Sequence, residues 1–321
     1  MFKRLVNECK IELTLRPQGA MLIKSGLAQI SGVDMAWVRV FRNGHDEVYL
    51  PGSSLKGTIR SHAERIARTM NEHAACDPFA GHRDKDKPHS CGTALELYQK
   101  REKKTELTMR EAYRLSCPIC KLFGNTQMMG RLATEDAYVK EGTNPPSPQQ
   151  RDGVGIDRFT GGAARGAKFE LEVITEGEFH TTLHLTNFEL WQLGLLGFVL
   201  YDLKDGLVRF GSGKSRGLGK VAATVDTIQL QYVGSPTRLA ENGRVHLLGV
   251  GALYDRAPEE YGMQSDDHLQ VDADGIRIVE PAIPGLRQTA EFTFDDFPWQ
   301  QLAEKWLAFV NNFTDALADF R

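Results

Sequence analysis

Hydrophobic and polar positions alternate near the beginning of the chain. Ile11, Leu13 and Leu15 are separated by polar or charged residues, and this two-residue period is typical of a strand with one buried face. Residues 169–173 alternate in the same way, and residues 207–210 and 218–230 are predicted as strands on either side of a glycine-rich loop. The pattern therefore predicts several strands that lie far apart in the sequence.

Between and after these strands, apolar residues recur with the helical period. After a turn at Pro51 and Gly52, either Ser53 or Ser54 can cap a helix that extends to about Met70. Its apolar stripe consists of Leu55, Ile59, Ala63, Ile66 and Met70. A capping box of Thr186 and Glu189 begins a second helix with the apolar repeat Leu190, Leu193, Leu196 and Leu200. A last helix has one apolar side, made of Trp299, Leu302, Trp306, Phe309, Val310, Phe313, Leu317 and Phe320.

The order of these elements predicts an α+β protein with a ferredoxin-like core, in which a strand–helix–strand unit occurs twice. We assign this core to residues 1–230 and an acidic extension to residues 231–321. Residues 72–128 are so polar and interrupted that we expect an insertion outside the apolar core, and residues 141–167 form a second irregular stretch. The open face of such a sheet is often used to bind RNA.

Composition narrows the class of protein. With 321 residues, 41% of them hydrophobic, the chain can bury a large core. It lacks the long apolar run of a membrane span, and the apolar stretch of a signal peptide is missing from its first residues, so we expect a cytoplasmic protein without membrane contact. Residues 1–220 carry 32 Lys and Arg against 26 Asp and Glu, whereas residues 221–321 carry 7 against 16. This charge balance neither supports nor excludes a nucleic-acid partner.

Four of the five cysteines lie close together in the sequence, which favours a metal site over a disulfide framework. Cys117 and Cys120 form a C-x2-C knuckle, and Cys76 and Cys91 precede it in the same polar segment. Four thiolates complete a closed tetrahedral site, so we predict about one structural zinc ion per chain. His73, His82 or His89 can replace one of the first two cysteines, and the alternative to a metal site is a group of free buried thiols.

Residues 211–220 (GSGKSRGLGK) combine glycines with three cations, which is typical of a loop that brings backbone amides close to an anion such as phosphate. A nucleotide-binding P-loop requires glycine at position 208, where the chain has Val208, and a helix after the loop, where the sequence predicts a strand. A plain turn between two strands explains the glycines equally well.

Four blocks of the sequence, taken in order, resemble the RAMP superfamily and, within it, the Cas-seven-group backbone subunits of type III CRISPR effector complexes. They are residues 30–34 (ISGVD), residues 51–57 (PGSSLKG) with Arg60, residues 122–132 (LFGNTQMMGRL) and residues 211–221. The resemblance covers residues 8–230 and implies a subunit that assembles with CRISPR guide RNA, target RNA, neighbouring backbone subunits and other Cas proteins.

The resemblance implies that the start of the first helix and the glycine loop hold the phosphates of the guide RNA. The residues concerned are Ser53, Ser54, Lys56, Arg60, Gly211, Ser212, Gly213, Lys214, Ser215, Arg216 and Gly217. Residues 141–167 occupy the place of the family's thumb hairpin, where Arg158 can pair with phosphate and Phe159 can stack on a base. The alternatives are that the two serines only cap the helix and that Phe159 packs in the core.

Asp34 matches the aspartate with which active members of this family cut target RNA. Its carboxylate can accept the proton of a 2′-hydroxyl, or hold Mg or another divalent cation during the displacement. Lys24 and Arg39 flank it in the sequence, and His45 with His62 is a less favoured acid–base pair. Since some members of the family do not cleave, the alternative is a structural RNA-binding subunit in which Asp34 is idle.

Overall fold

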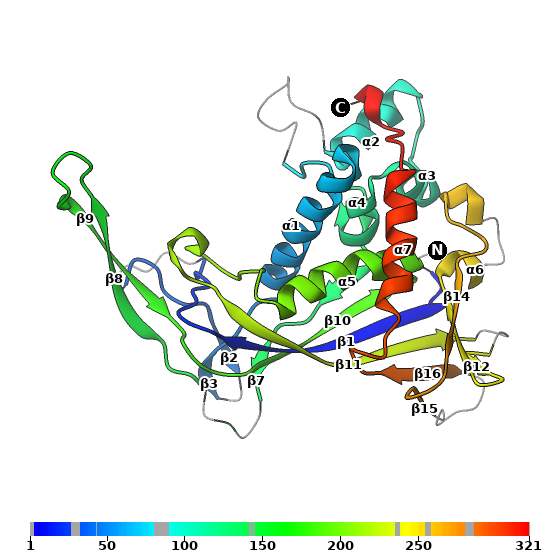
Figure 1. The fold of residues 1–321 in the computed structure, drawn as a ribbon. Coiled ribbons are helices and arrows are strands. Elements are labelled where there is room, and N and C mark those ends of the chain that lie inside the picture. The colour runs from blue at the N-terminus through cyan, green and yellow to red at the C-terminus, as the bar shows by residue number, and fades with distance from the viewer. Residues whose placement is uncertain are drawn as a thin grey trace.

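The computed structural model describes residues 3–26, 33–42, 44–79, 90–140, 143, 145–234, 238–253, 258–279 and 286–320. Most of this chain is built on one antiparallel sheet, covered on one face by helices (Figure 1). The fold is thus of the α+β type that the sequence predicts.

The centre of the sheet is β1 (Asn7–Pro17), which pairs with β10 (Phe179–Thr186) on one side and β11 (Val221–Val233) on the other. On the β10 side the sheet ends with β6 (Leu132–Thr134) and β7 (Tyr138–Val139). On the β11 side it continues through β16 (Arg287–Phe292) to β15 (Arg277–Val279). The predicted alternation of β1 is confirmed, because Ile11, Leu13 and Leu15 are all buried.

Three long helices cover the upper face of this sheet in Figure 1: α1 (Gly52–Met70), α5 (Leu190–Lys204) and α7 (Trp299–Asn311). Helices α5 and α7 approach closely because α5 carries glycine where they meet. A Cβ atom on Gly194 would lie 2.0 Å from the Leu302 carbonyl oxygen, and one on Gly197 would lie 2.6 Å from the Trp299 ring. The C-terminal helix is therefore packed against the helix that follows β10.

The described parts of residues 72–128, which are 72–79 and 90–128, do not form a polar insertion outside the core, contrary to the sequence prediction. They form η1 (Glu72–Ala74), α2 (Cys91–Arg101), α3 (Met109–Leu115), α4 (Pro118–Phe123), β4 (Gly124–Asn125) and β5 (Met128–Met129). Leu95, Tyr113, Ile119 and Leu122 from this segment are fully buried in the main hydrophobic core. The prediction was wrong because each of these helices is short and contributes only a few apolar side chains, which the polar residues between them outnumber.

Two hairpins leave the body of the protein. Strands β8 (Gln149–Ile156) and β9 (Ala163–Val173) form a long hairpin that projects far beyond the sheet (Figure 1). The shorter hairpin consists of β2 (Arg39–Arg42) and β3 (His45–Val48). The segment before β2 lies along β9, through a bridge between Met35 and Leu171 and hydrogen bonds on either side of it.

The C-terminal third adds to the body of the protein at its other end. It contains a three-stranded sheet of β12 (Ala240–Glu241), β13 (Arg244–Leu248) and β14 (His268–Asp272), with α6 (Val250–Leu253) and η3 (Pro258–Tyr261) beside it. Helix α7 ends at Asn311 instead of continuing to Phe320, where only the short turn η4 (Ala318–Phe320) is helical. The Asp315 side chain accepts a hydrogen bond from the Leu317 backbone, a local contact that competes with helix formation.

Two further details differ from the sequence predictions. Thr186 is the last residue of β10 rather than a helix cap; α5 begins after Glu189, whose backbone N–H donates to the Gln192 side chain. Residues 207–210 contain only a single bridge, between Arg209 and Lys220, because the chain turns into the glycine loop there. Within the described residues, no helix is both long and apolar enough to cross a bilayer.

Candidate nucleic-acid interface and metal centre

Helix α1 begins at Gly52, two residues earlier than a cap at Ser53 would require. Pro51 occupies the N-cap position and makes no side-chain cap, so that Ser53 and Ser54 lie inside the first turn. The Asp136 carboxylate accepts a hydrogen bond of 2.6 Å from the Gly52 backbone N–H and thereby takes the place of the cap. The serines are consequently free of the capping role that the sequence suggested for one of them, and Ser53 is exposed.

The glycine loop is held by backbone contacts that side chains would prevent. Gly211 and Gly219 have φ angles of +75° and +84°, and a Cβ atom on them would lie 2.0 Å from the Leu22 carbonyl oxygen and 2.1 Å from the Phe210 carbonyl oxygen. The Ser212 N–H donates to the Leu22 carbonyl and the Gly219 N–H donates to the Ala20 carbonyl. After the loop the chain enters β11, not a helix, which excludes the P-loop interpretation.

These two segments, distant in sequence, line the same pocket of about 570 Å³. Helix α1 contributes Ser53, Ser54 and Thr58, and the glycine loop contributes Gly211 and Ser212. Lys24 adds a cation from the segment that precedes β2, and Tyr49 adds an aromatic ring. Hydroxyl donors, backbone amides near a helix start and a lysine are the groups that bind phosphate in proteins.

Lys56 and Arg60 face a different side of α1. Both line a second pocket of about 410 Å³, which is also bordered by Cys76, Cys91 and Cys120. The Arg60 guanidinium donates to Glu64, to the Gly124 carbonyl at 3.0 Å and to the Cys120 sulfur at 3.7 Å. Burial, with the charge of Arg60, lowers the pKa of Lys56. The structure therefore brings Arg60 to the cysteines and not to the glycine loop.

Arg216 of the glycine loop lies beside the base of the long hairpin. The Arg216 guanidinium lies 5.4 Å from the centre of the Phe169 ring of β9, and Arg209 donates to the Lys214 carbonyl at 3.0 Å. Residues Lys214–Arg216 form a short 3-10 turn in which all three side chains are at the surface. The loop is thus ordered by its own arginines and by the hairpin.

Asp34 lies at the same hairpin base, exposed to solvent. One of its carboxylate oxygens accepts a hydrogen bond of 2.8 Å from the Glu170 backbone N–H. Arg39, expected to assist it, instead forms a two-pronged ion pair with Glu172 at 3.0 Å. The part of the family motif at residues 30–32 lies outside the described residues.

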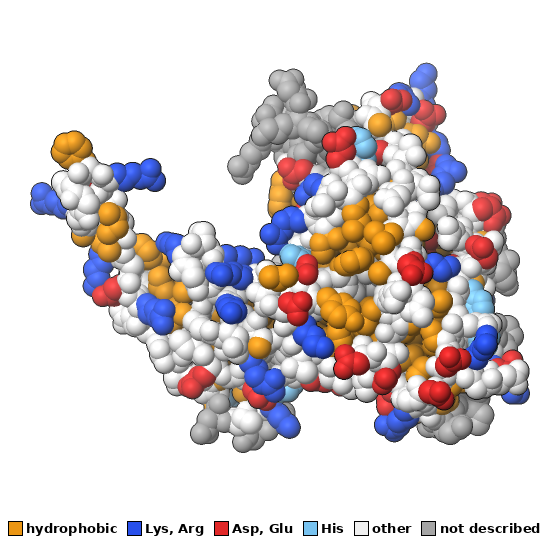
Figure 2. All heavy atoms as spheres, viewed as in Figure 1, with side chains coloured by type: hydrophobic (Ala, Val, Ile, Leu, Met, Phe, Trp, Pro, Cys, Tyr) orange, Lys and Arg blue, Asp and Glu red, His pale blue; other side chains and the backbone are white. Residues whose placement is uncertain are grey.

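The tip of the long hairpin carries Arg158 and Phe159. Phe159 is 99% exposed, so the alternative of core packing is wrong. The tip turn is held by Asp157, whose carboxylate accepts from the backbone N–H groups of Phe159 and Thr160. Figure 2 shows Lys and Arg side chains gathered on the concave surface between this hairpin and the helical layer, with hydrophobic side chains along the hairpin.

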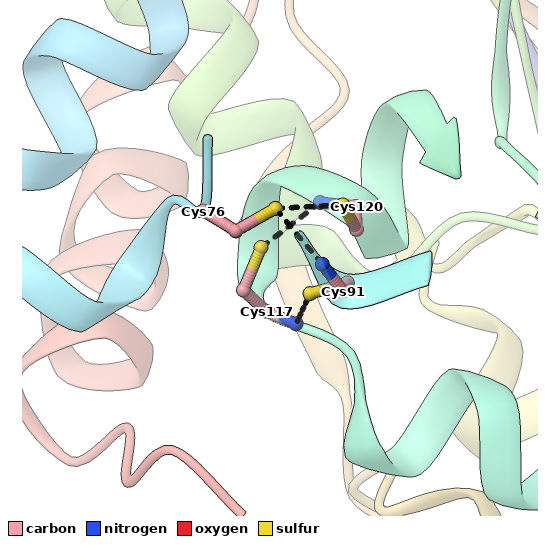
Figure 3. A group of neighbouring side chains, drawn as sticks. All are labelled: Cys76, Cys91, Cys117 and Cys120. Carbon is pink, nitrogen blue, oxygen red and sulfur yellow. Dashed lines mark hydrogen bonds between the residues drawn. The ribbon is translucent and has the colours of Figure 1, made fainter. Parts of the chain in front are cut away.

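Cys76, Cys91, Cys117 and Cys120 converge on one buried point, with all four sulfur atoms within 4.8 Å of one another (Figure 3). The sulfurs of Cys76 and Cys120 lie 3.5 Å apart. Four ligands at a Zn–S distance of about 2.3 Å place sulfurs about 3.8 Å apart, so the cluster is compact enough that it could hold a metal ion such as zinc. Four cysteines supply all four ligands of a tetrahedral site. Of the histidines considered as replacements, His73 is exposed beside Glu72, and His82 and His89 lie outside the described residues.

Each sulfur of this cluster also receives one N–H donor. The backbone N–H groups of Cys91, Cys117 and Cys120 point at the sulfurs of Cys76, Cys91 and Cys117 respectively, at 3.3–3.5 Å. Arg60 supplies the donor for the fourth sulfur, that of Cys120. Such donors stabilise thiolates and orient metal ligands. Cys9, by contrast, is buried alone on β1, and burial raises the pKa of its thiol.

Sequence reasoning missed several of the residues in these sites. No sequence motif marks Asp136 or Thr58. The sequence suggests that Lys24 assists Asp34, whereas the structure places Lys24 in the pocket. Asp136 reaches the start of α1 only in the folded chain, because the bridge between Leu50 and Ala137 brings the two segments together. Arg60 was placed correctly on α1, but its side chain faces the cysteines.

The fold and these sites define a class: an antiparallel-sheet protein with a helical face, a projecting hairpin, a four-cysteine cluster and a pocket between a helix start and a glycine loop. The sequence model of the RAMP superfamily matches residues 36–222, more than half of the chain, and the chain therefore belongs to that superfamily. RAMP-superfamily proteins work in CRISPR-Cas complexes with RNA and other Cas subunits. A search of curated proteins found no match.

Proposed function

We propose that this chain is a backbone subunit of a type III CRISPR effector complex and binds guide RNA along the concave surface in Figure 2. The observation that carries the proposal is the shared pocket, in which Ser53 and Ser54 of α1 face Gly211 and Ser212 of the glycine loop. A phosphodiester in this pocket would meet the hydroxyl donors of α1 and Ser212 and the Lys24 ammonium group.

The sheet supports the same proposal. In the order β11-β1-β10-β6, α1 connects β1 to β6 and α5 connects β10 to β11, which is the plan of a ferredoxin-like core. The β8–β9 hairpin then corresponds to the thumb, with Arg158 at its tip to pair with phosphate and Phe159 to stack on or displace a base. The four cysteines hold a structural zinc ion beside α1, because a closed set of four thiolates has no position for substrate.

Target-RNA cleavage by Asp34 is a second candidate function, favoured by the exposure of this carboxylate at the hairpin base. The hydrogen bond from Glu170 fixes its orientation, and the carboxylate could accept a 2′-hydroxyl proton or hold Mg²⁺. The alternative is a structural RNA-binding subunit without cleavage. Complementary RNA and Mg²⁺ added to the guide-loaded complex distinguish the two, since equal cutting by wild type and Asp34→Ala would remove Asp34 from the mechanism.

RNA that copurifies with the expressed complex tests the proposed function itself. We expect sequencing to reveal repeat-derived guides. The proposal would be abandoned if the complex carried no RNA, or only random fragments, while its subunits remained assembled.

A further inference from the structure

One face of α1 carries a row of alternating charges beside the cysteine cluster. Arg60, Glu64 and Arg68 are spaced four residues apart, so their side chains lie along the same face of the helix. One carboxylate oxygen of Glu64 accepts a hydrogen bond of 2.9 Å from Nε of Arg60, and the other lies 3.6 Å from the Arg68 guanidinium. The Glu64 side chain is only 12% exposed. The carboxylate therefore orients both arginines.

Arg60 joins this row to the segment that supplies Cys117 and Cys120. Its two terminal nitrogens donate to the Gly124 carbonyl at 3.0 Å and to the Cys120 sulfur at 3.7 Å. Gly124 is the C-cap of α4, and the last carbonyl groups of a helix lack partners within it. All three nitrogens of the guanidinium thus have a partner within the protein, whereas the resemblance to the superfamily had assigned Arg60 to phosphate.

Arg68 joins the row to the segment that supplies Cys76. Its Nε donates to the Ala75 carbonyl at 3.1 Å, and a terminal nitrogen donates to the Cys76 carbonyl at 2.8 Å. Cys76 and Cys120 are 44 residues apart in the chain, and Figure 3 shows them reaching the cluster from different segments. Helix α1 therefore holds both segments at a place where the two sulfurs lie 3.5 Å apart.

The charge of a metal site built from four thiolates explains why an arginine lies there. Four thiolates around a divalent ion carry a net charge of about −2. Burying such a charge is unfavourable unless groups of opposite charge or hydrogen-bond donors lie close to it. Arg60 brings both to the Cys120 sulfur, because a guanidinium is a donor that keeps its positive charge. Arg68 brings a second positive charge to the backbone of Cys76.

We propose that Arg60, Glu64 and Arg68 are positioning residues for the metal ion and form a clamp by which α1 keeps the cysteine site assembled. This inference rests on the metal site of the proposed function. Its ligand is a divalent ion that prefers four thiolates, as zinc does. Arg60 acts on a ligand sulfur directly, whereas Arg68 acts only through the backbone of a ligand segment. Removing such hydrogen-bond partners of metal ligands typically lowers metal affinity about 10–100-fold.

The first test measures the zinc affinity of the full chain by competition with a chromophoric chelator. We expect Arg60→Gln to weaken zinc binding about tenfold, because the Cys120 sulfur and the Gly124 carbonyl lose their donor. Arg60→Lys should weaken it about threefold, since it retains the charge without the planar fork, and it serves as the test if Arg60→Gln does not fold. Arg65→Gln is the matched control. Arg65 lies on the same helix but contacts His62 instead of the cluster, so this variant should bind zinc as wild type does.

Cobalt(II) in place of zinc separates the direct contact from a purely structural role. Removing an N–H donor from a thiolate makes its electrons easier to transfer to the metal ion. The sulfur-to-cobalt charge-transfer absorption should therefore move to longer wavelength in Arg60→Gln. Arg68→Gln should weaken metal binding without this shift, because Arg68 contacts a carbonyl oxygen of Cys76 and not a sulfur. Weaker binding by Arg60→Gln with an unshifted band would overturn the direct action on Cys120.

The clamp and the proposed function fail in different ways. If wild type holds zinc and Arg60→Gln matches Arg65→Gln in zinc affinity, the clamp is wrong while the metal site stands. If wild type holds no zinc, the metal site and the clamp both fail, and the copurifying RNA still tests RNA binding. RNA affinity of metal-loaded Arg60→Gln should stay near that of wild type. A loss of RNA affinity with unchanged zinc affinity would assign Arg60 to phosphate and overturn the clamp.

Discussion

The cysteine cluster and the pocket at the glycine loop lie on different sides of α1 and are built in opposite ways. Every sulfur of the cluster is buried and has an N–H donor, so the cluster is directed inwards and closed to solvent. The pocket is open, and it is lined by Lys24 and by the hydroxyl-bearing residues Ser53, Ser54, Thr58 and Ser212. The cluster is therefore closed within the protein, whereas the pocket is open to a ligand.

The largest effect should follow from breaking the cluster. Cys117→Ser is expected to abolish metal binding and to destabilise the fold by at least several kcal/mol, since the helices α2 and α4 that carry the ligands also form part of the core. Elemental analysis of protein purified without chelator, combined with thermal unfolding, measures both quantities. Wild type should contain about one zinc per chain.

Cys9→Ala is the matched control, because Cys9 is equally buried but lies outside the cluster. It should retain the metal and lose only about 1 kcal/mol for the small cavity. A metal content of zero in wild type, or unchanged stability of Cys117→Ser, would contradict the structural role of the cluster.

The next effect concerns the glycine loop. Gly211→Ala should displace the loop from Leu22 and break the Ser212 hydrogen bond, because the new Cβ would overlap the Leu22 carbonyl. RNA affinity should fall at least tenfold, whereas metal content stays the same. Binding is measured by anisotropy and metal by elemental analysis.

The variant Gly217→Ala tests the effect of backbone strain in the loop without a steric overlap of the new Cβ atom. Gly217 also has a positive φ, of +85°, but a Cβ there meets nothing within 4 Å. This variant should cost about 1–2 kcal/mol of stability and weaken RNA binding less than Gly211→Ala does. Equal losses of affinity in both variants would mean that the contact with Leu22 does not shape the site.

A smaller effect is expected at the hairpin tip. Phe159→Ala should leave thermal unfolding unchanged, because the ring is almost fully exposed, but should weaken the binding of guide-paired RNA by about 1–3 kcal/mol. Phe41→Ala is the control, since Phe41 is 72% exposed on β2. Should both variants bind alike, the tip would have no stacking role.

The smallest effect concerns Lys56, which lines the pocket bordered by the cysteines. Because burial and Arg60 lower its pKa, Lys56 loses its charge at a lower pH than an ordinary lysine does. RNA affinity of wild type should therefore decline modestly as the pH rises from 8 towards 10, and Lys56→Arg should flatten this decline. Identical pH profiles for wild type and Lys56→Arg would show that Lys56 is not part of the interface.

The sequence predicted the framework better than the sites. Strong periodicity revealed β1 and α1, and the glycines around Gly211 marked a loop that does approach other backbone closely. The sequence did not reveal that α2, α3 and α4 contribute to the hydrophobic core, because short helices have too few apolar positions to show a helical period. The sequence also does not show which partner a helical side chain contacts. Arg60 and Arg65 belong to the same helix, yet only tertiary contacts decide that Arg60 contacts Cys120 and Arg65 contacts His62.

Crosslinking of RNA to the intact protein, followed by mass spectrometry of the peptides, tests whether RNA binds at the pocket between α1 and the glycine loop. We expect crosslinks in the segments around Ser53, around Gly211 to Arg216, and at the tip of the β8–β9 hairpin. Crosslinks confined to the acidic residues 231–321, with none at the pocket between α1 and the glycine loop, would contradict this expectation.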